Sequence, residues 1–226
     1  MGLLKENLEA LVRRINDTCA RTGRSPDEIR LVAVTKNFSP ELINRAVDLG
    51  IKEIGENRVQ EAMSKFDQVR SGVVWHMVGH LQRNKVKKAL EIFDMIQSLD
   101  SERLAKEISK RCKKRVPVLI EVNTSGEATK FGIEPAQLSE LVALILSLKN
   151  LDLQGLMTIG PGWAITDPEA SRPCFRLLGD LKKKIEDDFG LGLPILSMGM
   201  SSDFEVAIEE GSTMIRVGTA IFGPRL

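Results

Sequence analysis

The chain is poor in cysteine and contains no long apolar run, and each shortage excludes a class of protein. Its three cysteines, Cys19, Cys112 and Cys174, are odd in number and far apart, so neither a disulfide framework nor a cysteine-rich zinc site fits. We interpret them as reduced core thiols of a cytoplasmic protein. No apolar run reaches the length of a bilayer span, and the N-terminal segment resembles an amphipathic helix more than a signal peptide.

The chain also has almost no net charge, because 32 Lys and Arg residues face 31 Asp and Glu residues. A balance of +1 provides no overall attraction to nucleic acid or to an anionic membrane. We therefore expect neither as a partner. Any basic binding site must be local.

Histidine is scarce as well, and the only two, His76 and His80, stand four residues apart. That spacing can bind zinc on a helical face, but Gly79 and the β-rich residues before it indicate a strand followed by a loop. No further Cys or His cluster completes a site, so we predict no metal. His80, at the strand end, is expected to line a pocket, and His76 is expected to be a buried packing residue.

Strand and helix patterns alternate along the whole chain. Leu4, Leu8, Leu11, Ile15 and Cys19 form one apolar stripe, which predicts an N-terminal helix. Eight strand-like segments follow, at 29–34, 52–56, 73–79, 93–99, 116–124, 153–160, 194–200 and 214–220. Each is succeeded by a helix or a turn. Eight such units predict an α/β protein with a (β/α)8 TIM barrel, a single domain over 1–226 with the extra N-terminal helix. An open doubly wound sheet is the alternative.

Lys36 closes the first predicted strand. Val32 and Val34 have the same parity along the strand, so a strand that directs them into the barrel brings the Lys36 amine to the edge of an apolar interior. Loss of hydration there favours the neutral, nucleophilic amine. Such a lysine can form an imine with a carbonyl compound. The alternative is a lysine that extends into solvent.

Arg216 lies in the eighth predicted strand, and alternation gives it the direction opposite to that of its two neighbours. An arginine directed into a barrel needs an acceptor or an anion, because burying it unpaired is costly. It could contact a ligand, or it could pair with Glu121 of the fifth strand. Both contacts could exist together.

The loops after the seventh and eighth strands suit a phosphate group. Ser202 and Glu205 match a capping box, which would expose backbone amides at the start of a helix. Gly218 permits close approach after the eighth strand, and Thr219 adds a hydroxyl. Barrels of this fold often bind phosphate at these two loops, so a phosphorylated ligand is expected.

Two further polar positions allow two interpretations each. Asn57 follows the second strand and could bind a ligand, although capping of the next helix fits its spacing better. Lys130 belongs to a polar loop after the fifth strand. That loop could be a mobile lip with a second cation, but a solvated surface is the better interpretation.

Several segments occur together in one known family: AVTK, GENRVQE, WHMVGHLQRNK, TKFGI, LMTIG and LSMGMSSDFEVAIEEGSTMIRVGTAIFG. They resemble the YggS/PROSC family of pyridoxal-phosphate-binding proteins, also called pyridoxal phosphate homeostasis proteins. The resemblance extends over nearly the whole chain. It implies a barrel similar to the N-terminal domain of alanine racemase.

The resemblance also implies a set of residues around pyridoxal 5′-phosphate. Lys36 would form the internal aldimine, and Arg216 would face the pyridine nitrogen. Ser201, together with Gly218 and Thr219, would hold the phosphate. The full set of expected cofactor-binding residues is Lys36, Asn57, His80, Met200, Ser201, Arg216, Gly218 and Thr219. Arg58 stands where this family usually has a tyrosine, so a ring contact at that position is in doubt.

The family's role implies a protein of vitamin B6 homeostasis that binds pyridoxal 5′-phosphate without robust catalysis. An arginine at the pyridine nitrogen leaves that nitrogen largely unprotonated, which weakens the cofactor as an electron sink. Alanine racemase uses a tyrosine from an additional domain of its partner subunit, whereas this chain has no tyrosine and ends just after its eighth strand. A monomer is therefore expected, with apoenzymes that depend on pyridoxal phosphate as candidate recipients.

Two enzymatic functions are the alternatives. One is a racemase of low activity, or a decarboxylase, that acts on amino acids through the same aldimine. The other dispenses with the cofactor and makes Lys36 the Schiff-base residue of an aldolase acting on a sugar phosphate.

Overall fold

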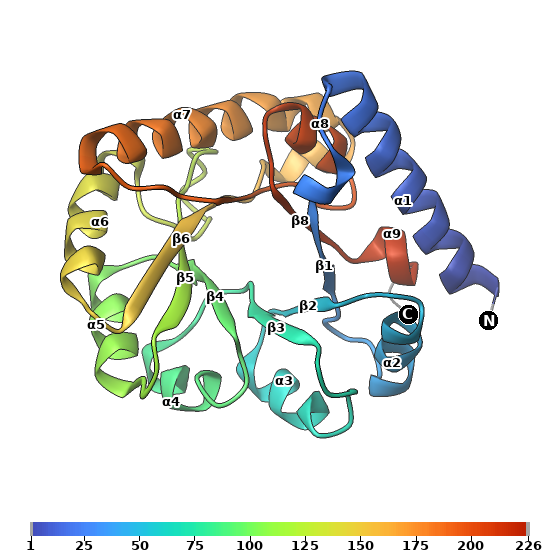
Figure 1. The fold of residues 1–226 in the computed structure, drawn as a ribbon, viewed down its shortest axis with the longest axis horizontal. Coiled ribbons are helices and arrows are strands. Elements are labelled where there is room, and N and C mark those ends of the chain that lie inside the picture. Colours follow the sequence, from blue (N-terminus) through green and yellow to red (C-terminus); the bar gives the residue numbers. More distant parts are fainter. Residues whose placement is uncertain (1, 225–226) are drawn as a thin grey trace.

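Eight parallel strands close into a barrel in sequence order, and helices surround it (Figure 1). The computed structural model describes residues 2–224. The strands are β1 (Arg30–Val34), β2 (Glu53–Glu56), β3 (Val74–Met77), β4 (Met95–Leu99), β5 (Val116–Glu121), β6 (Leu151–Met157), β7 (Ile195–Ser197) and β8 (Met214–Val217). Because β8 pairs with β1, with Arg30 opposite Met214, the predicted TIM barrel is confirmed and the open sheet is excluded.

The helix α1 (Gly2–Thr22) precedes the barrel, and a helix follows each strand, as predicted. These are α2 (Pro40–Asp48), α3 (Val59–Phe66), α4 (Val86–Ala89), α5 (Glu102–Arg111), α6 (Leu138–Ser147), α7 (Arg172–Phe189), α8 (Phe204–Glu209) and α9 (Thr219–Phe222). A serine cap and a proline start α2. The Ser39 hydroxyl accepts the Leu42 amide at the start of α2, and Pro40 fills the first helical position.

Apolar side chains form two separate cores because strand residues alternate between the two faces of the barrel wall. The larger core lies between the wall and the helices. The smaller one fills the inside of the barrel and consists of Val32, Met95, Leu119, Met157, Ile195 and Met214. Val32 and Met214 therefore fix the inward parity of β1 and β8, which the functional argument depends on.

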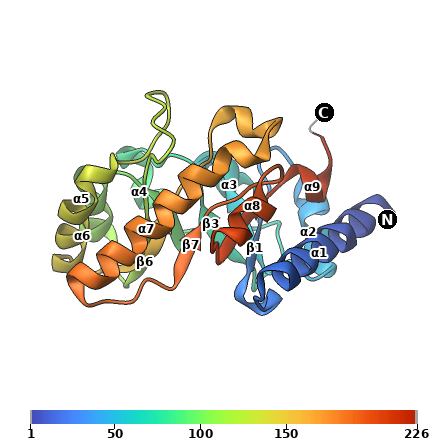
Figure 2. The same cartoon turned by 90° about the horizontal axis from the view of Figure 1, so that it is seen from above.

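The N-terminal helix α1 covers the side of the barrel formed by α8 and α9 (Figures 1 and 2). Its predicted stripe is confirmed, because Leu4, Leu8, Leu11, Ile15 and Cys19 are all buried. No helix in the described part of the chain combines the length and the apolarity needed to cross a membrane. All three cysteines are free, but Cys112 is only half-buried, so it is not the core thiol that we expected.

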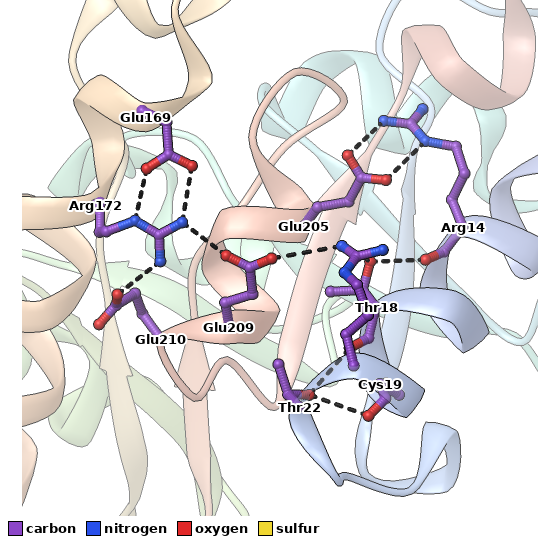
Figure 3. A network of polar contacts seen from close by, with 10 residues as sticks. Arg14, Thr18, Cys19, Thr22, Glu169, Arg172, Glu205, Glu209 and Glu210 are labelled. Atoms are coloured by element: carbon purple, nitrogen blue, oxygen red, sulfur yellow. Dashed lines mark hydrogen bonds and ion pairs between the residues drawn. The ribbon is translucent and has the colours of Figure 1, made fainter.

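A network of charged side chains joins α1, α7 and α8 (Figure 3). Arg172, at the start of α7, donates to Glu169, Glu209 and Glu210 over 2.6–2.8 Å. Glu209 also accepts from Arg21 of α1. Arg172 is thus the centre of the network.

Replacing Arg172 with alanine is expected to lower the free energy of unfolding by about 1–2 kcal/mol, because three carboxylates lose a shared, partly buried partner. Urea denaturation measures this. Arg176→Ala is the matched control, since Arg176 contacts Glu210 from a side chain that is 64% exposed, and we expect little change. Equal effects of the two substitutions would contradict a central role for Arg172.

Candidate functional site

Lys36 lies at the mouth of the barrel, by which we mean the carboxyl ends of the strands. The strand β1 ends at Val34, so Lys36 does not close it but follows two residues later. Thr35 continues the pairing with β2, because its amide donates to the Gly55 carbonyl over 2.9 Å. Lys36 is half-buried, and Asn37 turns the chain with a φ of 66°, in the left-handed region. Lys36 thus begins a turn at the carboxyl end of β1.

Arg216 points into the barrel, as the alternation of β8 predicted. It is 4% exposed. Its Nη1 donates to the Ser197 hydroxyl over 2.6 Å, and its Nη2 donates to the Thr158 carbonyl over 2.7 Å. Burial lowers the pKa of Arg216 to about 10, although the charges of Glu121 and Asp203 act in the opposite direction. Arg216 therefore remains a cation at neutral pH.

The expected salt bridge between Arg216 and Glu121 is not formed among the described residues, and the two side chains interact only through space. Glu121 is 4% exposed, and its Oε2 has no hydrogen-bond partner within residues 2–224. Burial, reinforced by the charge of Asp100, raises the pKa of Glu121 to about 7, and Arg216 opposes that rise only in part. Glu121 is therefore a weak acid that titrates near neutrality.

Glu121 lines a small cavity at the mouth, between the ends of β5 and β6. The cavity has a volume of about 130 Å³ and is also lined by Asn123, Lys130, Phe131 and Thr158. Two larger clefts, of about 540 and 640 Å³, lie at the amino-terminal ends of β3, β4 and β5. None of the expected cofactor-binding residues lines either cleft. The candidate site is therefore at the mouth, where those residues lie.

The loops after β7 and β8 meet at a hydroxyl group. Ser201 Oγ accepts from the amides of Gly218 and Ala220, each over 3.3 Å. Gly218 packs tightly, because a Cβ built on it would lie 3.2 Å from the Val34 carbonyl oxygen. Thr219 is exposed at the first position of α9. Both amides thus bond to the Ser201 oxygen beside the end of β1, and the Ser201 hydroxyl proton is left to donate to an anion. We call Ser201 with these two amides the anion cup.

The predicted capping box after β7 is wrong. The helix α8 begins at Phe204, so Ser202 is not its cap. Asp203 forms the turn instead, because its carboxylate accepts from the Met200 amide over 2.7 Å and from the Ser171 hydroxyl over 2.6 Å. Glu205, the other half of the expected box, binds Arg14 of α1.

The second and third strands bring Asn57 and His80 to the same end of the barrel. His80 Nδ1 lies 2.8 Å from an Asp100 carboxylate oxygen, and the ring stacks on Phe131 with 4.1 Å between centroids. Asn57 was expected to cap α3, but Arg58 occupies that position without a side-chain hydrogen bond. The Asn57 side chain makes no hydrogen bond within the described chain. The capping prediction is therefore wrong.

The expected site residues thus come from neighbouring strands of a closed barrel. Lys36 follows β1, Arg216 belongs to β8 and Ser201 follows β7, and these three strands are consecutive in the wall. Asn57 and His80 follow β2 and β3 on the other side of Lys36. The geometry brings together an amine, a buried guanidinium and an anion cup.

The chain matches the family described as "Alanine racemase, N-terminal domain" over residues 6–225. The pyridoxal phosphate homeostasis protein of Aquifex aeolicus is 45% identical to it over 224 residues, which cover 97% of both chains. The chain belongs to the pyridoxal phosphate homeostasis protein family. The structure of PipY from Synechococcus elongatus with PLP bound is 33% identical, covers 97% of this chain and 100% of that one, and superposes with a TM-score of 0.85.

Alanine racemase itself shares the fold. The Clostridium difficile enzyme superposes with a TM-score of 0.76 at 15% identity, covering 96% of this chain and 56% of the racemase. The barrel of the present chain therefore corresponds to one part of the longer alanine racemase chain. The predicted family and fold are both confirmed.

The sequence analysis missed a buried ion cluster that holds the segment next to Lys36 in this homeostasis-family barrel. Lys65 Nζ donates to the Thr35 carbonyl and to Glu56, each over 2.9 Å, and to Glu61 over 2.6 Å. Burial raises the pKa of Glu56 despite its bond to Lys65. The spacing of Glu61 and Lys65, four residues apart in one helix, was the signal that could have identified it.

Lys130 is also placed differently from the expectation. We predicted a solvated surface loop, but its side chain is 19% exposed and forms a 2.9 Å ion pair with Glu127. It also donates to the Gly160 carbonyl, while Glu127 accepts from the Gly162 amide. These bonds join the loops after β5 and β6, which project on the same side of the barrel (Figure 2).

Proposed function

We propose that this chain binds pyridoxal 5′-phosphate at the barrel mouth, through a covalent carbon–nitrogen bond to Lys36, and serves in the homeostasis of that cofactor. The observation that carries the proposal is the combination of an amine, a buried guanidinium and an amide-lined cup on three consecutive strand ends. The PipY structure with PLP bound supports it from a relative.

The residues of the site fit the chemical groups of this cofactor. Lys36 provides the amine that an aldehyde requires. The Ser201 oxygen accepts from the amides of Gly218 and Ala220, and its hydroxyl proton is left to donate to a phosphate. Arg216 uses two of its N–H groups on Ser197 and Thr158 and has others to direct at a ring nitrogen. Asn57, His80 and Met200 are proposed as neighbours of the ring.

The proposed role is that of a carrier rather than a catalyst. An uncharged pyridine nitrogen opposite Arg216 would leave the bound cofactor a weak electron sink. The sequence contains no tyrosine that could serve as a second acid–base group. We propose a cytoplasmic monomer that passes the cofactor to apoenzymes. Brisk racemisation of a single-enantiomer amino acid by the loaded protein would contradict the carrier role.

Reconstitution tests the binding itself. Mixing the purified protein with pyridoxal 5′-phosphate is expected to produce a visible absorption band that saturates at one equivalent and disappears on borohydride reduction. The spectrophotometric titration also gives the affinity. A protein that stays colourless at saturating cofactor would contradict the proposal.

The phosphate cup gives a second prediction. Ser201→Asp would place a carboxylate on the amides of Gly218 and Ala220, where it would compete with the phosphate. We expect the affinity for pyridoxal 5′-phosphate to fall by at least about tenfold, because like charges repel at short range. Pyridoxal, which lacks the phosphate, should bind the variant and the wild type alike.

The matched control for the cup is Ser202→Asp, since Ser202 does not accept from those amides. It is expected to have a smaller effect on the binding of the phosphorylated form. If Ser201→Asp lowered the affinities for pyridoxal and for pyridoxal 5′-phosphate equally, the anion cup would not be the phosphate site.

A further inference from the structure

A line of buried polar side chains crosses the inside of the barrel from Arg216 to Glu53. Arg216 Nη1 lies 2.6 Å from Ser197 Oγ, which lies 2.7 Å from Gln97 Oε1. Gln97 Nε2 lies 3.0 Å from His76 Nδ1, and His76 Nε2 lies 2.9 Å from Glu53 Oε2. Ser197, Gln97 and His76 have no solvent exposure, so water does not replace these contacts.

Donors and acceptors fix the direction of the bonds from Arg216 to His76, whereas the last contact, between His76 Nε2 and Glu53, has an ion-pair distance without hydrogen-bond geometry. A guanidinium only donates, so Ser197 must accept from Arg216 and give its own proton to Gln97 Oε1. The Gln97 amide then directs its Nε2 donor at His76 Nδ1. Since that nitrogen must accept, the His76 proton sits on Nε2 and faces Glu53.

The line ends in a carboxylate that stays ionised. Both Nε and Nη2 of Arg30 donate to Glu53, over 2.9 and 2.8 Å. Burial by itself would raise the pKa of Glu53, but the bonds from His76 and Arg30 outweigh it and bring the pKa to about 2. Glu53 is therefore ionised near neutral pH, and its negative charge, 2.9 Å from His76 Nε2, favours a proton on that nitrogen.

The position of Gln97 in the sheet accounts for its inward direction. Met95, two residues earlier in β4, belongs to the core inside the barrel. Residues two apart in a strand face the same side, so Gln97 points inward as well. Gln97 lies 100 positions from Ser197 in the sequence, so their contact exists only because the barrel closes.

We propose that Gln97 is a positioning residue for the cofactor, which through Ser197 fixes the Arg216 guanidinium at the barrel mouth. The inference rests on the proposed function, in which Arg216 faces the pyridine nitrogen. Without Gln97 Oε1, the Ser197 hydroxyl is free to rotate and can turn its proton toward Nη1. Arg216 then loses one of its two fixed acceptors, and the ring nitrogen loses a preorganised donor.

Nitrogen-15 NMR tests the direction of the line without any ligand. The chain has only two histidines, so their ring signals are readily assigned with His80→Gln as the reference. We expect His76 to show the neutral Nε2–H tautomer at neutral pH, and Gln97→Met to alter its Nδ1 signal. An Nδ1–H tautomer of His76 in the wild type would overturn the inference.

Binding measurements test the effect on the cofactor. Gln97→Met is expected to lower the affinity for pyridoxal 5′-phosphate by about tenfold and to shift the visible band. The reason is that the buried hydrogen bond between Ser197 and the charged Arg216 is lost. Ser197→Ala should do the same, and the double variant should add little to either single change, since both interrupt one line. Additive effects of the two substitutions would contradict the line.

Two further variants separate positioning from general damage to the barrel. Gln154→Met makes the same substitution in β6, where the Gln154 side chain donates a hydrogen bond to Asp152 of the same strand, and should leave the affinity and the band unchanged. Gln97→Glu retains an acceptor for Ser197 and should keep the affinity within about threefold. If Gln97→Met fails to fold, the two other variants still test the proposal. Unchanged affinity in Ser197→Ala would overturn it, and so would a large loss of affinity in Gln97→Glu.

The outcomes distinguish this inference from the proposed function. If the wild type forms no borohydride-stable adduct, the proposed function fails. If the wild type forms the adduct but Gln97→Met retains wild-type affinity and the wild-type band, only the role of Gln97 fails.

Discussion

Lys36→Ala is expected to abolish the covalent capture of pyridoxal 5′-phosphate. The variant should show no visible band at a cofactor concentration that saturates the wild type, and its affinity should fall by at least about 100-fold, because the covalent bond requires the amine at the end of β1. Any residual binding would come from the phosphate cup and Arg216. Spectrophotometric titration measures both quantities.

The fold should survive this substitution. Lys36 is half-buried and lies outside the apolar cores, so the free energy of unfolding should change by less than about 1 kcal/mol. Lys52→Ala, at an exposed position just before β2, is the matched control and should bind like the wild type. An undiminished visible band in Lys36→Ala would refute the assignment.

Glu121→Gln is expected to stabilise the protein at alkaline pH. Burial is the main reason that the pKa of Glu121 rises from 4.5 to about 7 in the folded protein. Between those values the folded state binds more protons than the unfolded state, so stability falls as the pH rises. The full loss is about 3 kcal/mol and is complete once the pH is well above 7.

The glutamine variant has no ionisable group at this position and escapes that loss. Urea denaturation near pH 5 should therefore give similar free energies of unfolding for the two proteins, while near pH 8 the variant should be more stable by up to about 3 kcal/mol. A difference that did not grow with pH would contradict the raised pKa.

Glu53→Gln is the contrasting control for the pH measurement. Burial raises the pKa of Glu53, but His76 and Arg30 bring it down to about 2. Its contribution to stability is therefore present above pH 4.5 and is lost only as the pH falls toward 2. The variant should be destabilised to a similar extent at pH 5 and pH 8, unlike the variant of Glu121.

Strand alternation and helical periodicity, which depend on neighbouring residues only, predicted where several side chains point. Alternation along a strand is enough to direct Val32 and Arg216 into a closed barrel, and strand ends of a barrel meet at one mouth. Lys36 could therefore be placed near the mouth and Arg216 inside the barrel before the structure was known, and their roles toward the cofactor stay predictions. The stripe of α1 follows from helical periodicity in the same way.

The residues that local rules missed depend on contacts across the barrel. Ser197 meets Gln97 only because the sheet closes into a barrel. The raised pKa of Glu121 depends on its burial and on the charges of Asp100, which follows β4, and of Arg216 in β8. Ser202 and Asp203 are adjacent residues that can both form caps, and the bond of Asp203 to distant Ser171 decides between them.

The most direct test of the central claim is the location of the cofactor adduct. The wild-type protein is saturated with pyridoxal 5′-phosphate, reduced with borohydride, digested and mapped by mass spectrometry. The account predicts one modified peptide, with the adduct on Lys36. An adduct confined to another lysine, or none at all, would contradict it.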